Sequence, residues 1–141
     1  DSRLYNWSQN ADGTISSTAK ELGDIDVVDE NGDPVLDDDG DQMVQLGVRS
    51  ELTAEVKQQQ GSMLEQTDWA VVRHSEKGTE IPANIVTYRD AIRAKATEME
   101  AAIDGAANTD AVAALFLTNT LEDDGSTTKS GVLYDWPELE K

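Results

Sequence analysis

The sequence has no cysteine among its 141 residues, and a single histidine, His74. Disulfide bonds, thiolate catalysis, cysteine-ligated zinc and a histidine-rich metal site within one chain are therefore excluded. Aromatic residues make up 5% of the chain, with one Phe, and apolar residues 38%. This content is low for a compact domain, so the composition predicts an elongated molecule with long loops.

Basic residues are also scarce, because 11 Lys and Arg stand against 29 Asp and Glu, for a net charge of −18. The net charge is −10 in residues 1–48, −2 in residues 49–103 and −6 in residues 104–141. A field of this sign repels phosphate backbones and anionic lipids, so we expect no nucleic-acid and no membrane partner. No apolar run approaches the roughly 18 residues that span a bilayer. Basic proteins or cations are the partners that this charge favours.

The first 48 residues are rich in turn signals. Residues 1–23 surround the turn sequence NADGT, which predicts an extended N-terminal arm or a short hairpin. Residues 24–48 place three apolar pairs around the turn sequences ENGDP and DDDGD. This pattern predicts an acidic β-meander of strand, turn, strand, turn and strand. We find no internal repeat in the chain.

From residue 49 onward the apolar spacing becomes that of α-helices. Ser50 is the candidate cap of a helix over about 51–65, and Pro82 suits the first turn of a helix over about 83–104. Residues 69–82 between them are predicted to form a loop. The second helix carries an apolar stripe at spacings of three and four residues, formed by Ile85, Tyr88, Ile92, Ala96, Met99 and Ile103.

A shorter helix is predicted after DGAANTD, capped by Thr109 or Asp110 and packed against the long helix. The helical region then spans residues 49–122, and residues 123–141 form a C-terminal docking tail whose VLYDWP segment contacts its own domain or a neighbour. The predicted fold class is α+β, with a small N-terminal β-meander and extended arm followed by a helical hairpin-like C-terminal part.

The acidic segment raises the question of calcium, because nine carboxylates lie between residues 24 and 41. A divalent cation would relieve their mutual repulsion. The spacing of an EF-hand loop fails, however, since Gly32 as the loop glycine puts Val27 at the first ligand position. A solvated acidic loop is the favoured interpretation and no metal site is assigned. The weak candidate ligands for Ca²⁺ are Asp29, Asn31, Asp37 and Asp39.

No pattern of residues indicates catalysis. His74 precedes a serine, but no glycine-bracketed serine elbow accompanies it, and a surface histidine is the favoured interpretation. Twenty-nine acids offer many carboxylate pairs and single out none, and no glycine-rich phosphate loop exists. We therefore predict that the protein is not an enzyme.

The stretch from residue 64 to 95 combines five of the 11 basic residues with Trp69 and the single histidine. In its simplest interpretation Trp69 packs between the two long helices, where a buried aromatic side chain contributes roughly 2–3 kcal/mol. Asp68 then accepts backbone N–H groups at the turn, or pairs with Arg89 or Arg93.

The same stretch also resembles a known family. A helix ending in Met63-Leu64 is followed by Thr67-Asp68-Trp69, then by Tyr88-Arg89 and Ile92-Arg93, and Trp136-Pro137 stands near the C-terminus. These motifs are similar to the C-terminal region of phage tail-fibre assembly chaperones and related tail assembly chaperone proteins. There, Asp-Trp precedes a helix that bears Tyr-Arg-x-x-Leu-Arg. The likeness covers about residues 27–103 and the final Trp-Pro, while the segment from Arg93 to Trp136 is longer than the usual tail.

The resemblance implies a non-enzymatic structural or assembly role in a tailed phage. The expected partners are other tail or virion proteins, the expected location is the virion or the host cytoplasm during assembly, and several copies are expected in one assembly. The structural module would comprise Asp68, Trp69, Tyr88, Arg89, Ile92 and Arg93, and the predicted partner-binding residues are Trp7, Tyr134, Trp136 and Pro137. The alternative hypothesis is a calcium-dependent binding or capsid-decoration module that uses residues 24–41.

Overall fold

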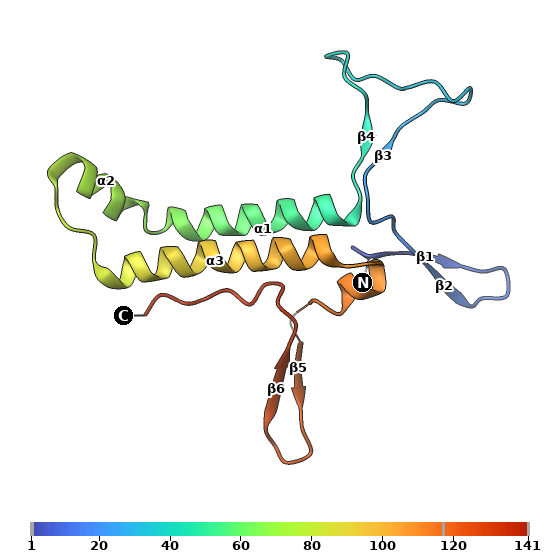
Figure 1. Cartoon of the computed structure of the whole chain (residues 1–141). Coiled ribbons are helices and arrows are strands. Elements are labelled where there is room, and N and C mark those ends of the chain that lie inside the picture. Colours follow the sequence, from blue (N-terminus) through green and yellow to red (C-terminus); the bar gives the residue numbers. More distant parts are fainter. Residues whose placement is uncertain (1, 117, 141) are drawn as a thin grey trace.

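A computed structural model describes residues 2–116 and 118–140 of the chain, and it has an α+β fold, as predicted (Figure 1). Its strands are paired as three separate hairpins, and its two long helices form the body of the molecule. The elements in chain order are β1 (Tyr5–Gln9), β2 (Ile15–Ala19), β3 (Ile25–Asp26), β4 (Val44–Gln45), α1 (Val48–Glu65), α2 (Asp68–Lys77), α3 (Ala83–Gly105), α4 (Thr109–Ala113), β5 (Thr118–Leu121) and β6 (Thr127–Ser130).

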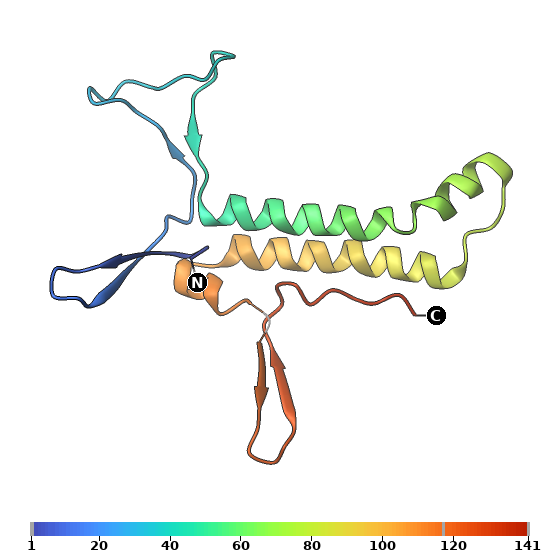
Figure 2. The same ribbon diagram turned by 180° about the vertical axis from the view of Figure 1, so that it is seen from behind.

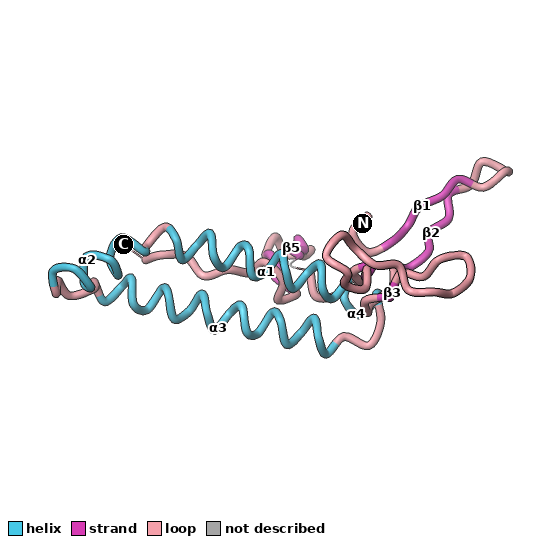
Figure 3. Tube along the Cα trace, turned by 90° about the horizontal axis from the view of Figure 1, so that it is seen from above, coloured by secondary structure: helices cyan, strands magenta, loops and turns pink. Residues whose placement is uncertain are grey.

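Helices α1 and α3 lie side by side and antiparallel (Figures 1, 2 and 3). The stripe predicted for α3 is confirmed, since all six of its residues are buried. Helix α1 turns Val48, Leu52 and Val56 toward it. Two amphipathic helices with matching apolar faces exclude water from both stripes at once, which is why they pair.

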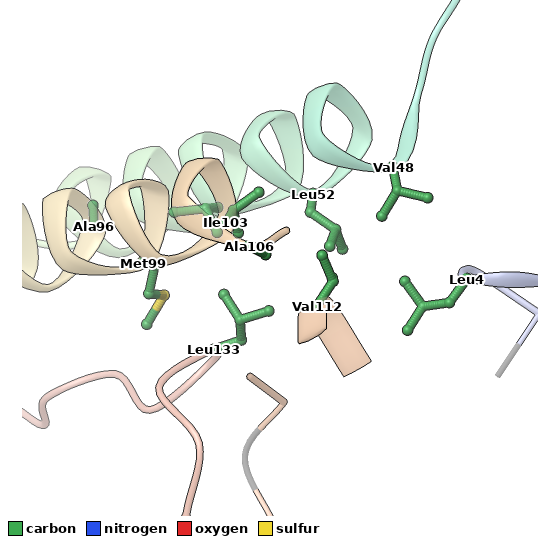
Figure 4. Close-up of a cluster of buried hydrophobic side chains, with 10 residues drawn as sticks. Leu4, Val48, Leu52, Ala96, Met99, Ile103, Ala106, Val112 and Leu133 are labelled. Atoms are coloured by element: carbon green, nitrogen blue, oxygen red, sulfur yellow. The ribbon is translucent and has the colours of Figure 1, made fainter. Parts of the chain in front are cut away.

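The main core lies where this helix pair meets both ends of the chain (Figure 4). Leu4 from the N-terminal segment is 1% exposed, and Leu133 from the C-terminal segment is 0% exposed. Leu4 and Leu133 therefore pack the N-terminal and C-terminal segments against the same part of the helix pair. From Leu133 the chain continues to the other end of α3, where the Asn84 side chain donates to the carbonyl of Glu140 at 2.9 Å (Figure 1). The cluster is formed by Leu4, Val48, Leu52, Val56, Ala96, Met99, Ile103, Ala106, Val112 and Leu133.

The beginning of α1 is held by the segment that follows the first hairpin. Gly47 caps this helix, so the predicted cap at Ser50 is wrong. The first two helical N–H groups donate to the carbonyls of Glu21 and Leu22, at 2.9 and 3.1 Å. A Cβ at residue 47 would collide with the backbone of Gly23. The two segments of the chain therefore approach so closely here that only glycine fits.

Helix α4 is short and joins the C-terminal half to the N-terminal half. Asn108 caps it, accepting the N–H of Ala111 at 2.8 Å, so the predicted caps at Thr109 and Asp110 are wrong. The Thr109 hydroxyl instead donates to the carbonyl of Lys20 at 2.8 Å. This bond satisfies a polar group that is buried in the described structure.

Two regular hairpins project from the body (Figure 1). β1 and β2 pair from Tyr5↔Ala19 to Gln9↔Ile15, so residues 5–19 form a hairpin, the second of the two possibilities predicted for the N-terminal segment. β5 and β6 pair from Thr118↔Ser130 to Leu121↔Thr127. The predicted boundary between residues 122 and 123 falls in the turn of this second hairpin.

Residues 27–43, here called the leaf segment, form a three-way junction in place of the predicted three-stranded meander. The N–H of Val27 donates to the carbonyl of Met43, that of Met43 to Val35, and that of Val35 to Val27, at 2.8–3.0 Å. These bonds close a ring above the short β3–β4 stem. The side-chain amide nitrogen of Gln42 lies within 2.8–3.3 Å of all three carbonyl oxygens.

The two loops of the leaf segment repeat each other. In each loop an aspartate, Asp29 or Asp37, accepts through Oδ1 the N–H groups two and four residues further on, at 2.8–3.0 Å. A glycine three residues after each aspartate adopts positive φ, +84° at Gly32 and +87° at Gly40. The segment therefore contains an eight-residue repeat, residues 27–34 and 35–42, that the sequence analysis missed.

Candidate protein-interaction surfaces

Two residues of the predicted module, Asp68 and Arg89, meet at the end of α1, but the module does not surround Trp69. From α3, Arg89 donates through Nη1 to the carbonyl of Leu64 at 2.7 Å, to Oγ1 of Thr67 at 2.9 Å and to Oδ1 of Asp68 at 2.8 Å. The predicted pairing of Asp68 with Arg89 is thus confirmed. Because the Arg89 side chain is 11% exposed, its charge needs these acceptors, and together they lock the α1–α2 junction onto α3.

The other α3 residues of the module divide between core and surface. Tyr88 and Ile92 are buried against α1. Arg93 takes no part in the cluster, because its side chain is 51% exposed and pairs with Asp90 one turn away at 3.4 Å. Arg89 is therefore the arginine of this motif that holds the fold together.

The prediction that Trp69 packs between the long helices is wrong. Its side chain is 53% exposed, and the residues after it form α2 where a loop was predicted. The helix begins after Thr67 and ends at Gly78, which adopts positive φ of +68°. In this short helix Ala70 turns inward and is fully buried, so the preceding indole points outward.

Trp69 and its neighbours form an exposed apolar patch with one cation. Val72, one turn further along α2, is 52% exposed, and the guanidinium of Arg73 lies 5.0 Å from the centre of the Trp69 ring. Stacking of this kind restrains an indole that would otherwise rotate in solvent. We call Trp69, Val72 and Arg73 the α2 patch.

The C-terminal aromatic residues contact their own chain. The phenol of Tyr134 donates to Oε2 of Glu55 at 2.8 Å, and the indole N–H of Trp136 donates to Oε1 of Gln59 at 2.7 Å. Burial and the Glu55 carboxylate raise the pKa of Tyr134 to about 12. Tyr134, Trp136 and Pro137 are all half-buried in the C-terminal segment. This placement argues against their predicted role as anchors for another protein.

Trp7 keeps the exposure that its predicted role requires. It lies on β1, is 56% exposed and contacts Tyr5 edge to face with ring centres 6.3 Å apart. Ile15 on the paired strand is 63% exposed. The first hairpin thus presents an aromatic and an aliphatic side chain beyond the body of the protein.

The acidic segment does not gather its carboxylates around a common centre. Asp29 and Asp37 each use one oxygen to accept backbone N–H groups of their own loop, and Asn31 and Asp39 donate those N–H groups from the backbone. Within the described ranges, no three His, Asp or Glu side chains converge as a metal site requires. The leaf segment does expose apolar side chains beside its acids, with Val28 at 53% and Leu36 at 57%.

A cleft of about 650 Å³ lies where the first hairpin and the β3–β4 stem leave the helices. Lys20, Ile25, Leu46 and Glu51 are among the residues that line it. Its lining combines both signs of charge with aliphatic side chains, which does not define one class of ligand.

His74 is exposed on α2, and its Nδ1 lies 3.0 Å from the carbonyl oxygen of Thr79. This contact fastens the end of α2 to the loop that leads into α3. The histidine is a surface residue, as the sequence indicated.

The sequence reasoning missed two surfaces, the α2 patch and the exposed side of the leaf segment. A signal for α2 was present, since Gly78 suits the left-handed residue that ends a helix. The eight-residue spacing of the two aspartate-glycine turns was a signal for the leaf segment.

No helix among the described residues is long and apolar enough to cross a membrane. Comparisons with protein-family models, with curated proteins and with solved structures return no match.

Proposed function

We propose that the protein is a non-enzymatic structural or assembly protein of a tailed phage that binds other tail or virion proteins. One observation carries this proposal: a rigid helix pair holds several separate exposed apolar surfaces, on the first hairpin, the leaf segment and α2. Exposed large apolar side chains that lie apart from the core are typical of protein-binding surfaces. A body that presents several such surfaces in different directions suits a component that contacts more than one neighbour.

The resemblance to tail assembly chaperones supplies the phage context of the proposal. Arg89 donates hydrogen bonds to both Thr67 and Asp68, so these motif residues are in contact with one another. This contact supports treating them as one module. In this proposal Trp69 is the module's exposed contact residue, and the protein acts in the virion or in the host cytoplasm during assembly, in multiple copies.

The test is quantitative mass spectrometry on purified virions of the phage that encodes the chain, together with electron microscopy of particles made without it. A permanent component is expected in the virion, and its loss should leave particles with defective tails. A transient assembly factor is expected to be absent from the virion, and its loss should produce the same defect. A chain absent from virions whose deletion leaves tails normal would contradict the proposal.

Chelation of divalent cations distinguishes the proposed function from the calcium-dependent alternative. We expect EDTA to leave both the thermal unfolding temperature and the co-purifying virion proteins unchanged. Release of those proteins by EDTA, reversed by added Ca²⁺, would favour the alternative instead.

A further inference from the structure

We infer that the α2 patch is a docking site for the leaf segment of a second copy of this chain, so that copies associate head to tail. The inference adds a specific contact to the proposed function, but it rests on the structure of the chain and holds whether or not the protein belongs to a phage.

The first step is that the α2 patch is fixed in place before any partner arrives. Arg89 ties the start of α2 to α3 through three hydrogen bonds, and Ala70 packs the helix against the body. Trp69 is held outward with the Arg73 guanidinium over its ring. Binding therefore orders few additional side chains, which favours docking at this patch.

The second step is that the patch carries positive charge that the chain itself leaves unpaired. Among the described residues no carboxylate pairs with Arg73 or with Lys77, and the Arg73 Nε atom is buried without a hydrogen-bond acceptor. A partner that offers apolar side chains flanked by carboxylates would fit this patch.

The third step is that the leaf segment has this chemistry. Residues 27–43 contain seven carboxylates and no Lys or Arg. Beside them Val28, Leu36 and Met43 are between 43% and 57% exposed. The ring of backbone hydrogen bonds and Gln42 holds these side chains on a defined frame.

The leaf segment and the α2 patch lie at opposite ends of the helix pair. The leaf segment leaves the body at the start of α1, and α2 lies beyond the other end of that helix (Figures 1 and 2). An α-helix of 18 residues is about 27 Å long, so the two surfaces cannot meet within one molecule. Two different complementary surfaces at opposite ends form a heterologous contact, which builds chains or rings of copies instead of a closed pair.

The experiment uses sedimentation velocity on the full chain at about 0.15 M salt. At this salt concentration, repulsion between the acidic copies is largely screened beyond about 8 Å. One variant lacks the α2 patch (Trp69→Ser with Arg73→Glu), and a second lacks the leaf surface (Val28→Ser with Leu36→Ser). All four side chains lie on the surface or at its edge, and circular dichroism verifies that each variant folds. Leu121→Ser is the matched control, because Leu121 is 74% exposed on the unrelated β5–β6 hairpin.

Wild type and Leu121→Ser are expected to form species larger than dimers as concentration rises. Each double variant alone is expected to remain a monomer, while an equimolar mixture of the two forms a dimer and nothing larger, since one intact patch and one intact leaf remain. A wild-type chain that stays monomeric up to about 1 mM, the concentration that corresponds to about 4 kcal/mol of binding free energy, would overturn the inference. So would a mixture of folded variants that fails to dimerise, or wild-type association that both variants retain.

Discussion

At the scale of single residues, Arg89 and Arg93 show how differently two arginines of one motif contribute. They lie four residues apart on α3, yet the Arg89 side chain is 11% exposed and joins three acceptors, while the Arg93 side chain is 51% exposed and pairs within its own helix. Hydrogen bonds from a buried charge contribute far more than an exposed ion pair. The fold should therefore depend on Arg89 and be almost indifferent to Arg93.

We expect Arg89→Ala to lower the free energy of unfolding by about 2–3 kcal/mol, because it removes the hydrogen bonds that this largely buried guanidinium donates to Leu64, Thr67 and Asp68. Arg93→Ala is the matched control and should change stability by less than about 0.5 kcal/mol. Urea denaturation followed by circular dichroism measures both. Equal losses for the two variants would show that Arg89 does not hold the α1–α2 junction.

A single carboxylate, Asp24, makes the stability of the fold depend on pH. The Gly47 N–H, which donates to Oδ1 at 2.8 Å, and the Ser50 hydroxyl hold the pKa of Asp24 below its usual value. A carboxyl whose pKa is lower in the folded state stabilises the fold above its unfolded pKa, about 3.9, and loses that contribution as the pH falls through its folded pKa. Asp24 therefore stabilises the start of α1 at neutral pH.

We expect Asp24→Ala to lower the thermal unfolding temperature at pH 7, and the gap to wild type to narrow as the pH falls below about 4. Asp26→Ala, at an exposed position on β3, is the matched control and should have little effect at pH 7. Scanning calorimetry between pH 7 and pH 3 gives the two curves. A gap that stays constant across this range would mean that the charge of Asp24 has no part in stability.

At the scale of elements, the leaf segment stands apart because its order comes from hydrogen bonds with little burial. Val28, Leu36 and Met43 are all exposed, so no apolar core holds the segment together. The ring of backbone hydrogen bonds and the Gln42 amide do so instead. Such a segment can open without unfolding the helices.

We expect Gln42→Ala to speed amide hydrogen exchange at Val27, Val35 and Met43 by about tenfold or more, because each lost hydrogen bond contributes about 1 kcal/mol to the closed state. Exchange in α1 and α3 should stay as it is in wild type. Gln45→Ala, at an exposed position on β4, serves as the control. Unchanged exchange at the three amides would show that the Gln42 side chain is not the centre of the junction.

The β5–β6 hairpin is an element that the core does not need. Its two ends meet at the body, where the N–H groups of Val132 and Leu133 both donate to the carbonyl of Leu115 at 2.9 Å. All of its strand residues are exposed. Leu133, which follows the hairpin, is by contrast fully buried.

We therefore expect replacement of residues 119–129 by Asn-Gly to change the free energy of unfolding by less than about 1 kcal/mol, since a two-residue turn can close the remaining Thr118–Ser130 pair. Leu133→Ala should lower it by about 2–5 kcal/mol by leaving a cavity in the core. Urea denaturation measures both variants. A larger loss from the shortened hairpin than from Leu133→Ala would reverse this ranking.

The contrast between these elements explains what the sequence could predict. The stripe of α3 runs over six buried positions, so period and length together identify the helix and its core face. Helix α2 has one buried residue, Ala70, and carries no stripe from which a helix could be predicted. The leaf segment satisfies backbone groups through a distant side-chain amide, and no apolar period records that contact.

The same reasoning applies to the candidate sites. The Asp68–Arg89 pair could be predicted because opposite charges lie in one motif. The exposure of Trp69 could not be predicted, because an indole is ordinarily expected to be buried. The residue that α2 buries is instead the next one in the chain, the small Ala70. Tyr134 and Trp136 look like free anchors in the sequence, and the acceptors that hold them, Glu55 and Gln59, lie far away along the chain.

At the scale of the whole molecule, charge is distributed in keeping with the architecture. The segment that forms α1 and α3 has a net charge of −2, whereas the parts that carry the projecting arms have −10 and −6. Acidic arms repel one another and keep the surfaces of the arms accessible, but the same repulsion opposes the compact state. The described ion pairs involve four of the basic residues, so they offset a small part of the excess acid.

We accordingly expect the thermal unfolding temperature to rise as NaCl is increased from about 0.01 M to about 0.15 M, because the Debye length falls from about 30 Å to about 8 Å and screens repulsion between the arms. The triple variant Asp33→Asn, Asp38→Asn and Asp39→Asn should flatten this rise, since it removes three charges from the leaf segment. Glu65→Gln, Glu76→Gln and Glu80→Gln together form the matched control, because they remove the same charge from the nearly neutral middle of the chain and should flatten the rise less. Calorimetry at each salt concentration decides the matter: an unfolding temperature that falls with added NaCl would mean that attractive pairs, and not repulsion between the acidic arms, dominate the electrostatics of the folded protein.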